Sequence, residues 1–171
     1  MESYRPFGRP ILRYVPPYSY GYAEDIEIEG GEVRGCQYIG GVFGAVCGSY
    51  TTRNCTVKDL SVVCVNPNND GNVHLLYAGG VVGWMGEGAY TFESCTAVDC
   101  TIVGTNGYAV GGVAAMVNQN CTLIDCSSTN VTVSCDVDTT GHQTGLVAGM
   151  MNGTVGSPVY VRGYSADAQS L

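Results

Sequence analysis

Cys55-Thr56-Val57-Lys58-Asp59-Leu60-Ser61 has two copies further along the chain, Cys95-Thr96-Ala97-Val98-Asp99-Cys100-Thr101 and Cys121-Thr122-Leu123-Ile124-Asp125-Cys126-Ser127. A glycine-aliphatic element also recurs, and its anchor positions are Gly41, Gly80, Gly112 and, in a weaker form, Gly145. Self-similarity at a period of a few tens of residues indicates that one structural unit is stacked on itself. The repeat therefore predicts the architecture before any local propensity is considered.

Apolar residues alternate within a unit, as Cys95 and Ala97 do before a corner at Val98-Asp99 and as Cys100 and Ile102 do after it. A period of two is typical of strands, and no stretch of ten residues has the period of a helix. Short strands that are separated by corners and repeated along the chain predict an all-β fold, a parallel β-solenoid of about four to five coils. The glycine pairs let one coil lie close against the next. A phosphate-binding loop is the alternative, but no Gly-Lys-Ser/Thr follows them.

One unit resembles a known repeat family. Gly79-Gly80-Val81-Val82-Gly83, followed by Ser94-Cys95-Thr96-Ala97, is similar to the GLUG repeat, and the similarity extends over successive units from about residue 36 to residue 156. The resemblance implies a bacterial cell-surface or adhesin-like protein. It also implies that the solenoid is right-handed and that the repeats carry no catalytic residues of their own.

Residues 1–23 differ from the repeat because they combine four prolines with tyrosines and arginines. We expect an ordered extended arm here, followed by the solenoid repeat domain at 24–164 and a C-terminal tail at 165–171. The arm carries three arginines and one glutamate, whereas the whole chain has a net charge of −8. We expect the arm to cover its own first coil near residues 26–28 or to reach a neighbouring molecule. The residues of this candidate assembly arm are Arg5, Arg9, Arg13, Tyr14, Tyr18 and Tyr20.

The cysteines recur at repeat positions, which predicts columns of stacked side chains. We expect one column of Cys55, Cys95 and Cys121 and a second of Cys100 and Cys126. Equivalent residues of parallel strands lie about 4.8 Å apart with parallel Cβ vectors, a geometry that does not favour the disulfide torsion. We therefore expect buried, mostly free thiols. No Cys-x-x-Cys is present, so no metal site is expected.

Asp59, Asp99 and Asp125 form a further expected column. Each aspartate is expected to accept hydrogen bonds from backbone N–H groups at a corner. Calcium binding is the alternative, but it needs six or more oxygen ligands. The adjacent threonines, Thr56, Thr96 and Thr122, are expected to face outward as strand residues.

An enzyme would need clustered acid, base or nucleophilic groups. The candidates are Glu87, Glu93, Arg53 and Lys58, which resemble the charged groups of polysaccharide lyases and hydrolases. Trp84 and Tyr90, near Tyr50 and Tyr108, are the candidates for a sugar-stacking surface. A solvated face and ordinary packing explain both sets more simply, so no catalytic residue, cofactor or enzymatic activity is expected.

These observations favour a non-catalytic structural or adhesive protein. The open ends of a solenoid expose unpaired backbone groups, so we expect a homo-oligomer or fibre formed through the ends or the arm. A carbohydrate-binding surface module is the alternative, and a polysaccharide lyase or hydrolase is the third reading. The acidic balance excludes nucleic acid as a partner, and no apolar run is long enough to span a membrane. The resemblance suggests an extracellular or cell-surface location, although no signal peptide is recognisable.

Overall fold

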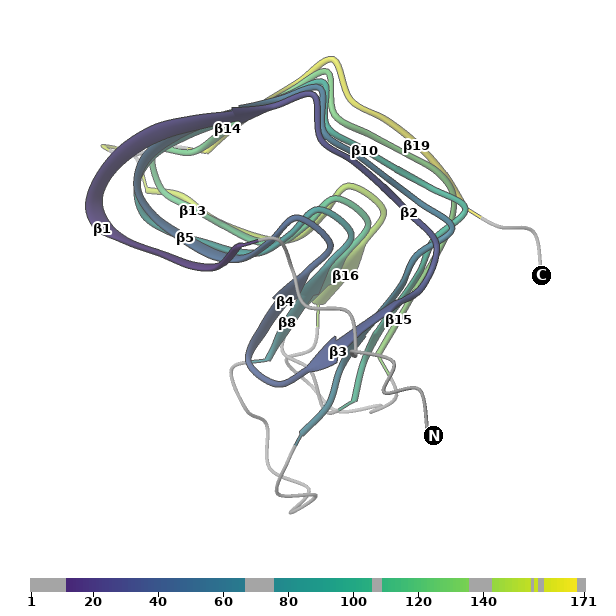
Figure 1. Ribbon diagram of the computed structural model, residues 1–171. Coiled ribbons are helices and arrows are strands. Elements are labelled where there is room, and N and C mark those ends of the chain that lie inside the picture. Colours follow the sequence, from purple (N-terminus) through teal and green to yellow (C-terminus); the bar gives the residue numbers. More distant parts are fainter. Residues whose placement is uncertain are drawn as a thin grey trace.

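The computed structural model describes residues 12–66, 76–105, 109–135, 143–154, 156 and 159–168, with the backbone alone at 12–20, 87 and 168. In these ranges the chain is all-β, without a helix, and its strands form three parallel sheets (Figure 1). The prediction of an all-β fold with parallel strands is confirmed.

The first sheet collects the longest strands. Its main order is β1 (Leu12–Glu24), β5 (Phe43–Arg53), β9 (Val82–Glu93), β13 (Ala114–Asn118) and β17 (Ala148–Asn152). Two short strands belong to the same sheet, β14 (Thr122–Ile124) and β18 (Tyr160–Arg162). β14 lies between β9 and β18, so β13 and β14 together occupy the place that the single long strand β9 has in the preceding layer.

The second sheet is built from two ribbons joined through β15. Its order is β2 (Glu27–Glu29), β6 (Thr56–Lys58), β10 (Thr96–Val98), β15 (Ser127–Cys135), β11 (Thr101–Gly104), β7 (Ser61–Cys64) and β3 (Glu32–Gly35), with β19 (Ser165–Ala168) also on β15. The third sheet contains β4 (Tyr38–Gly40), β8 (Tyr77–Gly79), β12 (Ala109–Gly111) and β16 (Gln143–Gly145).

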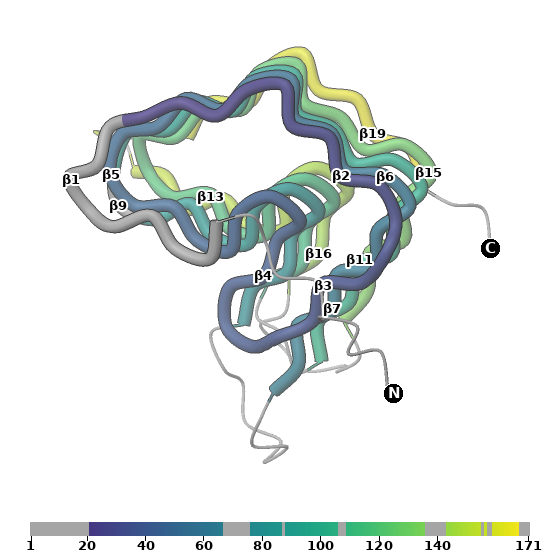
Figure 2. Tube along the Cα trace, viewed as in Figure 1, coloured from purple at the N-terminus to yellow at the C-terminus, as the bar shows by residue number. Residues whose placement is uncertain are grey.

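The chain passes through these sheets in the same order several times. β1 to β4, β5 to β8, β9 to β12 and β13 to β16 are four units, and β17 to β19 begin a fifth. Each strand pairs in parallel with its equivalent in the next unit, so the backbone traces follow one another in layers (Figure 2). We call this arrangement the stack.

Apolar side chains fill the space between the sheets. One buried cluster includes residues of every unit, and its largest fully buried side chains are Tyr90, Phe43 and Phe92. Phe43 meets the edge of Phe92 at a ring-centroid distance of 6.1 Å. Since burial of one large apolar side chain contributes about 1.5–3 kcal/mol, this shared core is the main source of stability.

The arm is part of the first sheet over residues 12–24. β1 pairs in parallel with β5 from Leu12 to Glu24, and the register shifts between Val15 and Ser19, where Pro16 and Pro17 lie. Residues 12–24 are thus extended and ordered, and they lie in the same sheet as strands of the repeat. Proline is tolerated because β1 is an edge strand with one partner. Arg5 and Arg9 lie outside the described residues, as do the side chains of Arg13, Tyr14, Tyr18 and Tyr20.

The register corrects both expected cysteine columns. Thr56 pairs with Thr96 and Thr96 with Ser127, so Cys55, Cys95 and Cys126 form one column. Cys100 is therefore not in a column with Cys126, and Cys121 lies beside Tyr90 because β14 pairs with the end of β9. The first two copied segments lie in the second sheet, whereas the third begins in the first sheet at β14. The predicted burial of the cysteines is confirmed for Cys55, Cys95, Cys100, Cys121 and Cys126, and all nine cysteines are free thiols.

Candidate assembly interface

Two corners of each unit use left-handed backbone. One corner column comprises Asp25, Asn54, Ser94, Asp125 and Gly163, and the other comprises Gly30, Asp59, Asp99 and Asn130, all with φ between 51° and 72°. Asparagine, aspartate and glycine tolerate this conformation best.

The aspartates do lie at corners, as expected, but Asp125 lies at a different corner from Asp59 and Asp99. Side-chain amides connect neighbouring layers at both corners. Asn54 Nδ2 donates to Asp25 Oδ1 over 3.1 Å, and Asn130 Nδ2 donates to Asp99 Oδ1 over 2.6 Å. At Asp25 and Asp99 a side-chain amide of the next layer thus binds the corner carboxylate.

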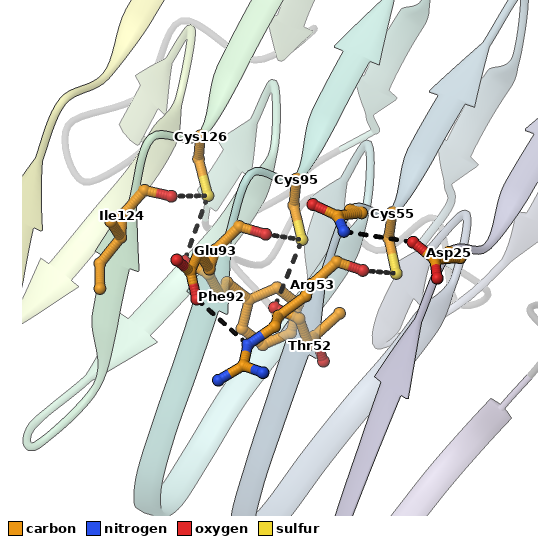
Figure 3. A network of polar contacts seen from close by, with 10 residues as sticks. Asp25, Thr52, Arg53, Cys55, Phe92, Glu93, Cys95, Ile124 and Cys126 are labelled. Carbon is orange, nitrogen blue, oxygen red and sulfur yellow. Dashed lines mark hydrogen bonds and ion pairs between the residues drawn. The ribbon is translucent and has the colours of Figure 1, made fainter.

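The thiols follow a common pattern next to these corners (Figure 3). Cys55 Sγ donates to Arg53 O over 3.3 Å, and Cys95 Sγ donates to Glu93 O over 3.5 Å. Cys95 also donates to Thr52 O of the preceding unit over 3.8 Å. Arg53 O and Glu93 O also accept from the backbone N–H groups of Asp25 and Asn54, so the thiols add a second bond to carbonyls that are already paired.

Burial and neighbouring sulfurs shift the pKa values of these thiols in both directions. Hydrogen bonds to Cys126 and Cys55, together with burial, raise the pKa of Cys95 above its ordinary value. The hydrogen bond with Cys95 lowers the pKa of Cys55 to about 7 and also lowers the pKa of Cys126. Burial raises the pKa of both Cys64 and Cys121 to about 12. A thiol is a nucleophile and metal ligand only as thiolate, so burial suppresses both roles at Cys64 and Cys121. In the described part of the chain, no three His, Cys, Asp or Glu side chains are grouped as a metal site would require. The two histidines, His74 and His142, lie outside the described residues.

The glycine anchors lie where successive units approach most closely. Gly41 N donates to Gly80 O over 2.8 Å, and Gly80 N donates to Gly112 O over 3.1 Å. A Cβ at Gly41 would lie 2.6 Å from Gly80 O, and a Cβ at Gly112 would collide with Leu146 O. Glycine is therefore required here whenever another unit follows.

The fourth anchor was assigned one position too early. Gly145 pairs with Gly111, the first glycine of its pair, and Leu146 occupies the position of Gly112. Leu146 has no following unit in the described structure, since β16 is the last strand of its sheet. The glycine requirement ends where the stack ends.

The far end of the stack, which we call the C-terminal face, is formed by β16 to β19. Each of these strands has one strand partner in the described structure, so its outer edge is unpaired. A hollow of about 360 Å³ opens here between Leu146, Val147, Ala148, Met151, Val161, Tyr164 and Ala166. Met151 is 57% exposed and Tyr164 is 62% exposed. Large apolar side chains and free strand edges thus occur together on this face.

The opposite end, which we call the N-terminal face, is formed by β1 to β4. A hollow of about 670 Å³ lies along β1, and its lining residues are Gly21, Tyr22, Ala23, Glu24, Thr51 and Arg53. Tyr22 is 76% exposed. This hollow carries an aromatic ring, a carboxylate and a guanidinium on the outermost strand.

The charged candidates for catalysis separate into two ion pairs. Arg53 Nε lies 3.1 Å from Glu93 Oε2. Lys58 Nζ lies 3.7 Å from Glu29 Oε1 and 3.8 Å from Asp59 Oδ2, at the next corner. All these side chains are exposed, and the Glu87 side chain lies outside the described residues. Exposed pairs of this kind contribute about 0–1 kcal/mol and resemble an ordinary solvated face.

The aromatic candidates for sugar stacking are also separated. Tyr90 is buried in the main core, in agreement with the packing interpretation and not with a sugar-stacking surface, and Tyr50 packs against that core. Trp84 instead stacks on Tyr38 at 5.0 Å, and Tyr38 stacks on Tyr77 at 5.6 Å. Tyr108 lies outside the described residues. Trp84 therefore belongs to a small aromatic cluster between the first and third sheets.

No family model, curated protein or solved structure matches this chain. The part of the chain that the structure describes contains no helix with the length and hydrophobicity needed to cross a bilayer.

Sequence reasoning missed the residues that distinguish the two faces. These are Tyr22 and Glu24 on the N-terminal face and Leu146, Tyr160 and Arg162 on the C-terminal face. Leu146 carried a readable signal, since it replaces the second glycine of the pair. The other four become significant only when the register is known.

Proposed function

We propose that the protein is a non-catalytic structural or adhesive element, a right-handed parallel β-solenoid that associates with itself through its open ends. In-register parallel layers and a shared core support the solenoid. Right-handedness follows the general chirality of parallel crossover connections. The adhesive role and a cell-surface location rest on the resemblance to the GLUG repeat.

The C-terminal face carries the self-association. Met151 and Tyr164 are two of the four most exposed large hydrophobic residues among the described residues, and both line the hollow on this face. Unpaired parallel edges of β17, β18 and β19 surround them. Burying apolar area and pairing free edges both favour association, and a strand edge of this kind pairs readily with another chain.

Leu146 lies outside this contact. β16 belongs to the unit before β17 to β19, so a second copy seated on β17 to β19 leaves the position against Leu146 open. The contact is therefore made at β17 to β19. Such an interface gives modest affinity and depends on protein concentration.

The test is a concentration series of the full chain, measured by size-exclusion chromatography with light scattering. The wild-type mass should rise with concentration. Met151→Glu places a carboxylate in the apolar hollow and should shift the midpoint to at least about 10-fold higher concentration. Thr101→Glu is the matched control, because Thr101 is an exposed strand residue in the middle of the stack.

A wild-type chain that stays monomeric over the whole series would contradict the proposal. Equal effects of Met151→Glu and Thr101→Glu would place the contact elsewhere.

A further inference from the structure

We propose that the partner on the C-terminal face is a second copy of this chain in the same orientation, with its β1 alongside β18. In this contact Arg162 faces Glu24 of the second copy, and Tyr160 faces its Tyr22. The inference rests on the proposed self-association and specifies its register.

One outward column ends in opposite charges at the two faces. The strand register aligns Glu24, Arg53, Glu93, Ile124 and Arg162. Arg53 and Glu93 within this column already form an ion pair of 3.1 Å. A second copy stacked in register would bring Glu24 next to Arg162 at the same layer spacing of about 4.8 Å. The column therefore continues with complementary charge.

The neighbouring outward column ends in tyrosines. Tyr22, Thr51, Thr91, Thr122 and Tyr160 are aligned along it. The terminal tyrosines are exposed, 76% for Tyr22 and 59% for Tyr160, whereas the threonines between them are half-buried. The hollow on the N-terminal face is lined by Tyr22 and Glu24, so it offers space for the Tyr160 and Arg162 side chains. Aromatic rings paired across layers would contribute about 0.2–1 kcal/mol.

The backbone hydrogen-bonding groups of the two faces also match. At the corner after this column, Asp25 N donates to Arg53 O over 3.2 Å, and Asp125 N donates to Arg162 O over 3.0 Å. Gly163 N occupies the next equivalent position, and Glu24 O of a second copy would be its acceptor. On the core side of the same strands, the register aligns Ala23, Thr52, Phe92, Leu123 and Val161. Val161 would therefore meet Ala23 of the second copy.

The same orientation is favoured over a two-fold arrangement. Contact of two C-terminal faces or of two N-terminal faces could not pair Arg162 with Glu24, because each face carries only one of these two residues. A head-to-tail contact is heterologous and leaves one free face of each kind, so it can be repeated.

The test is a charge exchange in the full chain. Glu24→Arg and Arg162→Glu should each weaken self-association about 10-fold at low salt, because each places like charges in contact. The double variant should recover an association midpoint within about threefold of wild type, since the pair is restored in reverse. Circular dichroism and the thermal midpoint of each variant verify folding.

Glu27→Arg is the matched control. Glu27 is an exposed residue of β2 on the N-terminal face, and its column ends at Ser165 rather than at Arg162. Glu27→Arg combined with Arg162→Glu should remain weak. Recovery in this combination would show that net charge alone, rather than the register, sets the affinity.

The outcomes separate the two proposals. If wild type associates but neither single variant weakens it, or if the double variant fails to recover, the register proposed here is wrong and self-association stands. If wild type is monomeric throughout, both proposals fail.

Discussion

The corner that holds Gly41, Gly80 and Gly112 differs from the last corner of the stack, where Leu146 has the same position. At the glycines the following unit lies so close that a Cβ would meet its carbonyl oxygen. At Leu146 no described strand follows, and a large side chain is present instead. Glycine at this position is a property of the contact between units, not of the turn within one unit.

The first glycine of the pair supports this distinction. A Cβ at Gly145 would collide with Ala148 O, three residues later in the chain, as a Cβ at Gly79 would with Val82 O. This glycine is therefore needed for the local turn and is retained at residue 145. Only the second glycine is replaced at the corner where no described strand follows.

Gly112→Ala is the substitution for which this comparison predicts the largest loss of stability. The new methyl group would collide with the Leu146 carbonyl, which is backbone and cannot rotate away. We expect the free energy of unfolding to fall by about 3 kcal/mol, measured by urea denaturation. Gly156→Ala is the control, because a Cβ there would meet no described atom within 4 Å, and it should change stability by less than about 0.5 kcal/mol. Similar losses for both would refute the role of the unit contact.

Leu146→Gly makes the last corner like the others. β16 belongs to the unit before β17 to β19, so a second copy seated on those strands does not meet the Leu146 Cβ. Leu146→Ala keeps the Cβ while removing the rest of the side chain. The two variants should therefore shift the association midpoint equally. Light scattering over a concentration series measures both, and a stronger association for glycine alone would show that the Cβ limits the contact.

A smaller change in stability is expected when a polar side chain that is enclosed by units on both sides is replaced. Thr52 is fully buried between Ala23 and Phe92, and its Oγ1 has no hydrogen-bond partner among the described residues. Thr52→Val should raise the free energy of unfolding by about 1 kcal/mol. Thr51→Val, on the outward side of the same strand, should leave stability nearly unchanged. A loss of stability in Thr52→Val would mean that the hydroxyl is satisfied.

The sequence predicted the features that depend on local chemistry. Repetition, alternation and the corner aspartates indicated parallel strands in repeated units, and the buried thiols and the corner position of Asp99 are confirmed. The register was harder, because one short pattern, a cysteine followed four residues later by an aspartate, fits two different corners. Cys95 to Asp99 follows the second sheet to one corner, whereas Cys121 to Asp125 follows the first sheet to the other.

The interface residues could not be read from local patterns. Glu24 and Arg162 are far apart in sequence, and the column that aligns them passes through three other strands. The pairing of the arm with β5 also depends on the register, and the edge strand β1 accommodates Pro16 and Pro17 at a register shift.

The thiol column contains an odd number of sulfur atoms. Cys95 lies between Cys55 and Cys126, so the column holds three sulfurs. Disulfide formation consumes sulfurs in twos, and whichever neighbour Cys95 were to join, the other would remain as a single thiol without its sulfur partner. An odd column cannot be completed by oxidation. Its three members stay alike only while all of them remain free thiols.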